Sequence, residues 1–172
     1  CHHQLSAPRG QHIPTWRDTA CVVMMSKYVD TSFAVAGTHG TTTVTAMLCE
    51  IFSRAGMSFT GHIGGAVKGN TGGIVSCGNE WFVTEACEYN RSFLTLSPYI
   101  TAVLNLQFDH PDCYRDMDDM VAAYDALIAN TSKAGCIVCS ATAERMRILK
   151  GRRGVTFGYK RGPGLCTYEV SS

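Results

Sequence analysis

The feature that most constrains the fold is a glycine-rich turn between an apolar run and an amphipathic segment. The apolar run SFAVAG occupies residues 32–37 and is typical of a buried strand. The turn GTHG leads into residues 42–56, which carry apolar side chains at helical spacing and end at Gly56, a residue that suits a helix terminus. This order predicts a strand–turn–helix unit whose turn lies at the carboxyl end of the strand.

The alternation of strands and helices continues along the chain. Further strands are predicted at 81–86, 100–106, 136–139 and 155–159, and further helices at 91–97, 115–130 and 141–150. The glycine-rich region from Gly61 to Gly78 is expected to hold loops and short strands. Strands that alternate with helices predict an α/β fold, with a mostly parallel sheet and helices on both faces.

Composition and charge limit the partners. Of the 172 residues, 45% are apolar and 17% are charged, which is typical of a globular protein. No apolar run approaches the roughly 20 residues of a membrane-spanning helix. The net charge of +1 gives no electrostatic reason to expect a nucleic acid. We therefore predict that neither a membrane nor a nucleic acid is a partner.

The nine cysteines favour reduced thiols. Their odd number and the lack of an export signal argue against a disulfide framework and predict a cytoplasmic protein. The one CxxC pair, Cys136 and Cys139, lies in a predicted strand, where the two side chains point to opposite faces and would not share a metal ion. A cysteine-based metal or redox protein stays an alternative that rests on the number of cysteines alone.

Polar side chains follow three of the predicted strands. The turn at 37–43 ends the first strand, Glu85 ends the second, and Asn105 with the pair Asp109 and His110 follows the third. Because the carboxyl ends of parallel strands meet at one edge of a sheet, we expect these three clusters to lie together.

The turn itself has most parts of a phosphate-binding loop. Gly37 and Gly40 allow backbone N–H groups to face phosphates, and the helix N-terminus behind them favours an anion. Thr42 stands where a hydroxyl would bind Mg²⁺, but Thr41 stands where such loops usually carry a lysine. A tight strand-to-helix turn that binds nothing explains the same glycines, so the turn alone leaves both interpretations open.

Together with three other segments, the turn resembles the Mur ligase family, the amide-forming enzymes of peptidoglycan precursor synthesis. The ATP loop of that family is GTxGKTT, and this chain has GTHGTTT at 37–43. The other segments, which agree in order and separation, are HIGGAVKGNTGG (62–73), VTEACEYNRSFL (83–94) and VLNLQFDHPDCY (103–114). The similarity covers about residues 31–160 and favours the branch that joins L-alanine to UDP-N-acetylmuramate.

The resemblance implies a fold and a reaction. Residues 31–172 would form the central ATP-binding domain, which is built like a P-loop NTPase, and residues 1–30 would be a remnant of the preceding domain. The N-terminal and C-terminal ligase domains would be largely absent. ATP would phosphorylate the muramate carboxylate, and the amine of L-alanine would attack the resulting acyl phosphate to form the amide.

The resemblance also implies roles for individual residues. The ATP-binding residues would be Gly37, Thr38, His39, Gly40, Thr41, Thr42 and Thr43. The ligands of Mg²⁺ or Mn²⁺ would be Thr42, Glu85, which would lie between two metal sites, and His110, which would lie near the acyl phosphate. Asn105 would orient the substrate and would form the catalytic group with Glu85 and His110. The sugar-nucleotide contacts would be Gly64, Gly65 and Asn70.

Taken one at a time, these residues have simpler explanations. Glu85 fits a surface carboxylate, His39 fits a side chain packed in its own loop, and Asp109 beside His110 fits a helix cap next to an incidental histidine.

Thr41 is too short to replace a lysine, so we expect weak ATP binding and catalysis impaired by several orders of magnitude. Two alternatives are a ligase that attaches a peptide to recycled muramate and a non-catalytic nucleotide-binding module of the same fold.

Overall fold

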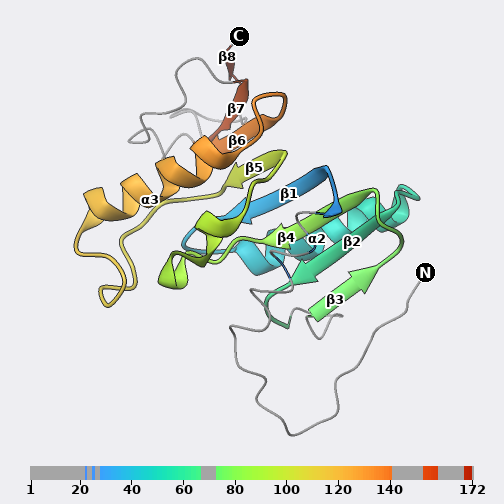
Figure 1. Ribbon diagram of the computed structural model, residues 1–172, viewed down its shortest axis with the longest axis horizontal. Helices are drawn as coiled ribbons and strands as arrows, with labels where there is room; N and C mark the ends of the chain where they lie inside the picture. The colour runs from blue at the N-terminus through green and yellow to red at the C-terminus, as the bar shows by residue number, and fades with distance from the viewer. Residues whose placement is uncertain are drawn as a thin grey trace, which may run out of the picture.

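The computed structural model describes Val22, Met25 and residues 28–66, 73–140, 153–158 and 169–171. These residues contain one eight-stranded sheet with the order β3-β2-β4-β1-β5-β6-β7-β8 (Figure 1). The strands are β1 (Thr31–Ala36), β2 (Phe59–Ile63), β3 (Gly73–Ser76), β4 (Trp81–Glu85), β5 (Ile100–Val103), β6 (Cys136–Ser140), β7 (Gly154–Phe157) and β8 (Glu169–Ser171). The helices are α2 (Thr41–Arg54), the 3₁₀ helix η1 (Tyr89–Thr95) and α3 (Met117–Asn130).

The six inner strands of the sheet are parallel, and the two edge strands are antiparallel. The strand β1 pairs in parallel with β4 on one side and with β5 on the other. The edge strands β3 and β8 run antiparallel to β2 and β7. The predicted α/β fold with a mostly parallel sheet is therefore confirmed.

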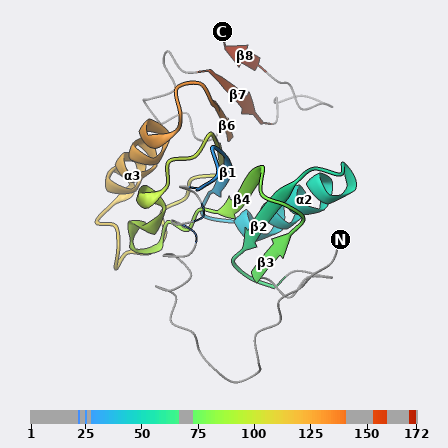
Figure 2. The same cartoon turned by 45° about the vertical axis from the view of Figure 1, so that its right-hand side comes forward.

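Helices cover both faces of this sheet. Side chains that are neighbours in β4 point to opposite faces. Phe82 belongs to the buried cluster that contains Tyr124 and Leu127 of α3, whereas Val83 belongs to the cluster that contains Cys49 of α2. Figure 2 shows α2 and α3 on opposite sides of the strands. The larger core lies on the α3 side.

The side of α2 that faces the sheet carries small residues at its deepest positions. Thr45 and Cys49 are buried, and Leu48 and Phe52 pack partly buried against the same cluster. The helix approaches β2 so closely that a Cβ atom added at Gly61 would clash with the sulfur of Cys49. Met47 is 58% exposed and Ile51 is 59% exposed, so the helical spacing of the apolar residues predicted the helix correctly but marks its buried side only in part.

The helix α3 begins at an aspartate cap. The side chain of Asp116 accepts a hydrogen bond of 2.8 Å from the backbone N–H of Asp119. Asp119 in turn pairs with Arg91 of η1 at 2.8 Å. A carboxylate at this end favours the helix because the N-terminus carries partial positive charge. The helix predicted at 115–130 thus exists and begins two residues later, after its cap.

Other predicted elements differ in length or type. The helix predicted at 91–97 is the 3₁₀ helix η1, which begins at Tyr89 and is interrupted by left-handed backbone at Asn90 and Arg91. The strand predicted at 100–106 ends at Val103, since the following residues leave the sheet and bond to the turn after β1. The helix predicted at 141–150 lies outside the described residues.

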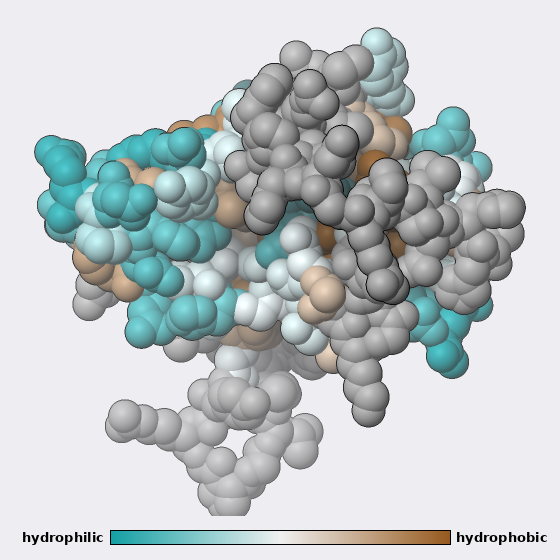
Figure 3. All heavy atoms as spheres, turned by 90° about the horizontal axis from the view of Figure 1, so that it is seen from below, coloured by the Kyte–Doolittle hydropathy of each residue, from teal (hydrophilic) through white to brown (hydrophobic). Residues whose placement is uncertain are grey.

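The two cysteines of the CxxC pair differ in burial, and the visible surface is largely polar or intermediate. Cys139 is buried in the cluster on the α3 side, whereas Cys136, three residues away in β6, is only half-buried. On the face drawn in Figure 3, the coloured residues are mostly hydrophilic or intermediate, and hydrophobic residues show only as small patches. Within the described ranges, no helix has both the length and the apolar character needed to cross a membrane.

Truncating a buried side chain of α3 and an exposed side chain of α2 should change the free energy of unfolding by different amounts. Leu127 is completely buried, so Leu127→Ala should lower the free energy of unfolding by about 2–5 kcal/mol. Ile51 lies on the exposed side of α2, so Ile51→Ala should change it by about 0.5 kcal/mol or less. Urea denaturation followed by circular dichroism measures both. A large loss for Ile51→Ala would show that this side of α2 is covered in solution.

Candidate functional site

The turn between β1 and α2 depends on two glycines. Gly40 caps α2 with φ at 83°, in the left-handed region, and its carbonyl accepts the N–H of Val44 at 3.0 Å. Gly37 has φ at 149°, and a Cβ atom added to it would lie 3.1 Å from the Cβ of Leu104. Because the first N–H groups of a helix have no partner within the helix, this end of α2 offers donors and partial positive charge to an anion.

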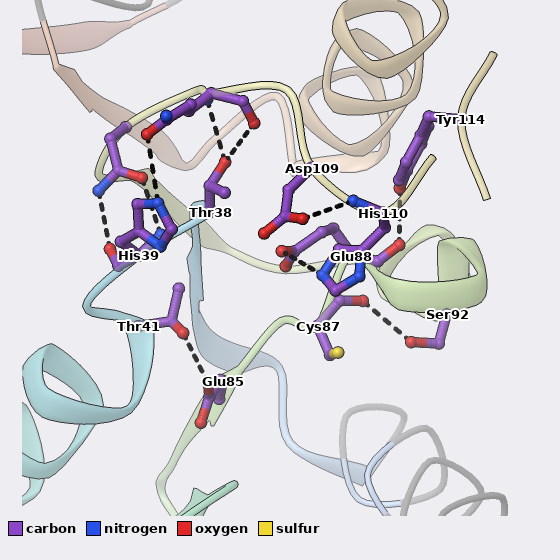
Figure 4. A network of polar contacts seen from close by, with 12 residues as sticks. Thr38, His39, Thr41, Glu85, Cys87, Glu88, Ser92, Asp109, His110 and Tyr114 are labelled. Atoms are coloured by element: carbon purple, nitrogen blue, oxygen red, sulfur yellow. Dashed lines mark hydrogen bonds and ion pairs between the residues drawn. The ribbon is translucent and has the colours of Figure 1, made fainter. Parts of the chain in front are cut away.

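Glu85 joins this turn to two neighbouring strands. Its Oε1 accepts the hydroxyl of Thr41 at 2.6 Å (Figure 4). The hydroxyl of Thr42 lies 2.9 and 3.0 Å from Oε1 and Oε2. Its Oε2 also accepts the backbone N–H of Gly64 at 2.9 Å. One carboxylate at the end of β4 thus holds the start of α2 and the segment after β2 together.

Gly64, the first residue after β2, makes the close approach of Glu85 possible, and Gly65 lies beside it. A Cβ atom added at Gly64 would lie 2.5 Å from Oε2 of Glu85, which is closer than real contacts allow. A Cβ atom added at Gly65 would lie 3.5 Å from the nearest atom of Thr42, which is an ordinary contact. The structure therefore brings Gly64 and Gly65 to the same site as Glu85 and Thr42. Asn70, predicted with them, lies outside the described residues.

The segment after β5 is tied to the other side of the turn. Asn105 makes two bonds to the backbone of His39: its Oδ1 accepts the N–H at 2.9 Å and its Nδ2 donates to the carbonyl at 2.7 Å. The hydroxyl of Thr38 donates to the carbonyl of Gln107 at 2.9 Å and accepts its N–H at 3.0 Å. The expected gathering of the three clusters at one sheet edge is therefore observed for the turn, Glu85 and Asn105.

Gln107 is a residue of this site that sequence reasoning missed. Its side-chain Oε1 lies 3.2 Å from Nε2 of His39, in addition to its two backbone bonds with Thr38. The signal for it was its place two residues after Asn105, since the same irregular segment carries both. His39 is thus held in its loop by polar contacts from the end of β5.

His110 pairs with Glu88, a carboxylate three residues after Glu85. Its Nε2 lies 3.5 Å from Oε1 of Glu88 (Figure 4). Its ring contacts that of Tyr89 edge to face. Glu88 is buried, and desolvation raises the pKa of its carboxyl above the usual value. The hydrogen bonds and ion pairs of the described residues join His110 to Glu88 and not to Glu85, so Glu85 and His110 are not in direct contact.

The oxygen atoms around Thr42 fit a magnesium ion. Adjacent ligands of an octahedral Mg²⁺, each about 2.1 Å from the ion, are about 3 Å apart. The Thr42 hydroxyl and the two Glu85 oxygens have that spacing, at 2.9 and 3.0 Å. Within the described part of the chain, no three His, Cys, Asp or Glu side chains form a metal cluster. An ion here would therefore take its other ligands from water and phosphate, as Mg²⁺ commonly does.

The part of the chain that carries the turn, Glu85 and Asn105 matches a known protein family. The family described as the Mur ligase middle domain matches residues 35–162. This chain belongs to the Mur ligase middle-domain family. The matched residues begin inside β1 and include the turn, Glu85, Asn105 and His110.

Curated relatives agree with this assignment. The chain is 37% identical to the UDP-N-acetylmuramate–L-alanine ligase of Caldanaerobacter subterraneus subsp. tengcongensis over 145 residues, which are 83% of this chain and 31% of the relative. It is 35% identical to the enzyme of that name from Acetivibrio thermocellus over 170 residues, which are 96% of this chain and 36% of the relative. The chain thus spans about a third of the length of these relatives.

Solved structures share the fold. The UDP-N-acetylmuramate-alanine ligase MurC of Thermotoga maritima superposes with a TM-score of 0.68 and 27% identity, over 85% of this chain and 33% of that one. A MurF ligase from Thermotoga maritima, in complex with ADP, superposes with a TM-score of 0.64 over 98% of this chain and 45% of that one. At 15% identity, the second likeness concerns the fold alone.

The contacts of Glu85 predict unequal effects for two neighbouring substitutions. Gly64→Ala should displace the carboxylate from the Gly64 N–H and lower the free energy of unfolding by about 1.5–3 kcal/mol, the range for a lost bond to a charged group. Gly65→Ala has room for its methyl group and should change stability by less than about 1 kcal/mol in either direction. Chemical denaturation of both variants measures the difference, and equal effects would contradict the described position of Glu85.

Proposed function

We propose that this domain binds the phosphates of MgATP and supplies the ATP site of a ligase that joins L-alanine to UDP-N-acetylmuramate. The observation that carries the proposal is the Thr42–Glu85 contact at the N-terminus of α2, where a hydroxyl and a carboxylate have the spacing of adjacent Mg²⁺ ligands. The names of the curated relatives support the same substrates.

Each part of the site has a role in this proposal. The turn of residues 37–43 holds the phosphates with backbone N–H groups, as helix N-termini favour anions. Thr42 and Glu85 hold Mg²⁺ or Mn²⁺, and His110 holds a second ion. Asn105 keeps the turn in shape through His39 and orients the substrate. The sugar-nucleotide contacts are assigned to Gly64, Gly65 and Asn70.

When bound, the nucleotide and its metal supply the phosphoryl group and the positive charge that activate the muramate carboxylate. The residues of this chain bind and orient: they hold the phosphates, and they place Glu85 next to the cation. We assign residues 31–172 to the central ATP-binding domain and residues 1–30 to the end of a preceding domain. Amide formation also needs the N-terminal and C-terminal ligase domains, because such sites are completed when domains close.

Thr41 weakens the site in this proposal. Its hydroxyl is neutral and donates to Glu85 at 2.6 Å, so it offers no positive charge to the outer phosphates. A charge-assisted hydrogen bond contributes about 1.5–3 kcal/mol. The same contact favours a second candidate function, a non-catalytic nucleotide-binding module, because the carboxylate lies next to the phosphate position without a compensating lysine.

A lysine at position 41 should therefore tighten nucleotide binding. We expect Thr41→Lys to lower the Kd for MgATP by roughly tenfold to a hundredfold, which corresponds to one charge-assisted bond. The matched control is Met47→Lys, which adds the same charge at an exposed residue of the same helix but outside the turn, and should have a much smaller effect. Isothermal titration calorimetry measures both variants beside the unchanged protein.

The comparison separates the possible functions. Tighter binding by Thr41→Lys and not by Met47→Lys supports a phosphate site at this turn. Equal binding by the two variants would mean that added charge, and not the loop position, attracts the nucleotide, and would contradict the proposal. Restored ligase activity of Thr41→Lys in a three-domain enzyme would favour the ligase, whereas binding without activity there would favour the non-catalytic module.

A further inference from the structure

Glu88 is a buried carboxylate to which the proposed function gives no role. It is only 7% exposed, and its Oε1 lies 3.5 Å from Nε2 of His110. A buried carboxylate is costly unless a polar partner compensates for the lost water. The imidazole of His110 is placed to be that partner, and Figure 4 shows the two side chains facing each other.

Tyr114 fixes the position of Glu88 relative to His110. Its hydroxyl donates a bond of 2.6 Å to the backbone carbonyl of Glu88, and burial raises the pKa of this hydroxyl to about 12, so it remains a donor. The backbone N–H groups of Cys113 and Tyr114 donate to the carbonyl of His110 at 2.8 and 3.0 Å. A completely packed tyrosine therefore connects the backbone of Glu88 to the turn that carries His110.

The backbone of His110 is also constrained. Its φ is 55°, in the left-handed region that a non-glycine residue adopts only at some cost, and its N–H donates to Oδ1 of Asp109 at 2.7 Å. The ring of Tyr89 packs against the imidazole with centroids 5.4 Å apart. The backbone bond and the ring contact limit the positions of the side chain, and Nε2 is the ring nitrogen that faces Glu88.

We propose that Glu88 is a positioning residue that holds neutral His110 in the tautomer with the proton on Nε2. A neutral imidazole has one N–H donor and one acceptor, and a carboxylate partner only accepts, so it selects the tautomer whose N–H faces it. Nδ1 is then the ring nitrogen that carries the lone pair. Histidines that bind metals usually donate their other ring N–H to such a carboxylate.

The inference deepens the proposed function, since the metal role of His110 belongs to that function. The tautomer itself needs neither nucleotide nor metal. A failure of MgATP binding would therefore contradict the proposed function and leave the assignment of Glu88 standing, and the reverse also holds.

Nitrogen NMR of the imidazole rings tests the assignment. Long-range ¹H–¹⁵N correlation on ¹⁵N-histidine-labelled protein, at a pH where the ring is neutral, distinguishes a protonated Nε2 from a protonated Nδ1. We expect His110 to be a single Nε2–H tautomer with a slowly exchanging ring proton. In Glu88→Leu, the acceptor is lost, and we expect the ¹⁵N shifts of the two ring nitrogens to move toward each other as the tautomers mix.

Two further variants complete the test. Glu88→Gln keeps the shape and one carbonyl acceptor, so it should retain more of the Nε2–H form than Glu88→Leu, and it serves if the leucine variant does not fold. Glu50→Gln removes an exposed carboxylate on α2 and should leave the His110 signals unchanged. A protonated Nδ1 in the unchanged protein, or His110 shifts that are the same in every folded Glu88 variant, would overturn the proposal.

Discussion

The site depends on one carboxylate at the end of a central strand. Glu85 accepts the hydroxyls of Thr41 and Thr42 and the N–H of Gly64, and so connects β4 with the start of α2 and the end of β2. The parallel register makes this possible, because Val35 of β1 pairs with Glu85 and the next residues of β1 enter the turn. A parallel sheet thus places the carboxylate at the helix N-terminus without any long side chain having to reach across.

Asn105 supports the opposite side of the same turn. Its amide bonds to both backbone polar groups of His39, so the turn is held from β4 through Glu85 and from the end of β5 through Asn105. These contacts fix the backbone of the turn, and a fixed backbone needs little rearrangement when a ligand binds, which is the physical basis of a preorganised site. At position 41 the turn carries a neutral hydroxyl, which donates to Glu85 at 2.6 Å.

Much of this arrangement was predictable from the sequence, because it follows from the order of strands and helices. The gathering of the turn, Glu85 and Asn105 followed from parallel strands alone. The contact between His110 and Glu88 did not follow from the order of strands, since both residues lie in irregular segments after their strands. Helical spacing also could not show that Thr45 and Cys49 lie deepest on α2, because close packing over Gly61 favours small side chains there.

The most direct measurement of the central claim is a ¹H–¹⁵N chemical-shift titration with MgADP, which detects even millimolar binding. The account predicts that the largest changes occur at the backbone amides of residues 37–43 and at Gly64, whose N–H bonds to Glu85. It also predicts smaller changes for the same residues when EDTA removes the magnesium. Changes that cluster away from the β1–α2 turn, or changes that do not depend on magnesium, would contradict a metal–phosphate site at Thr42 and Glu85.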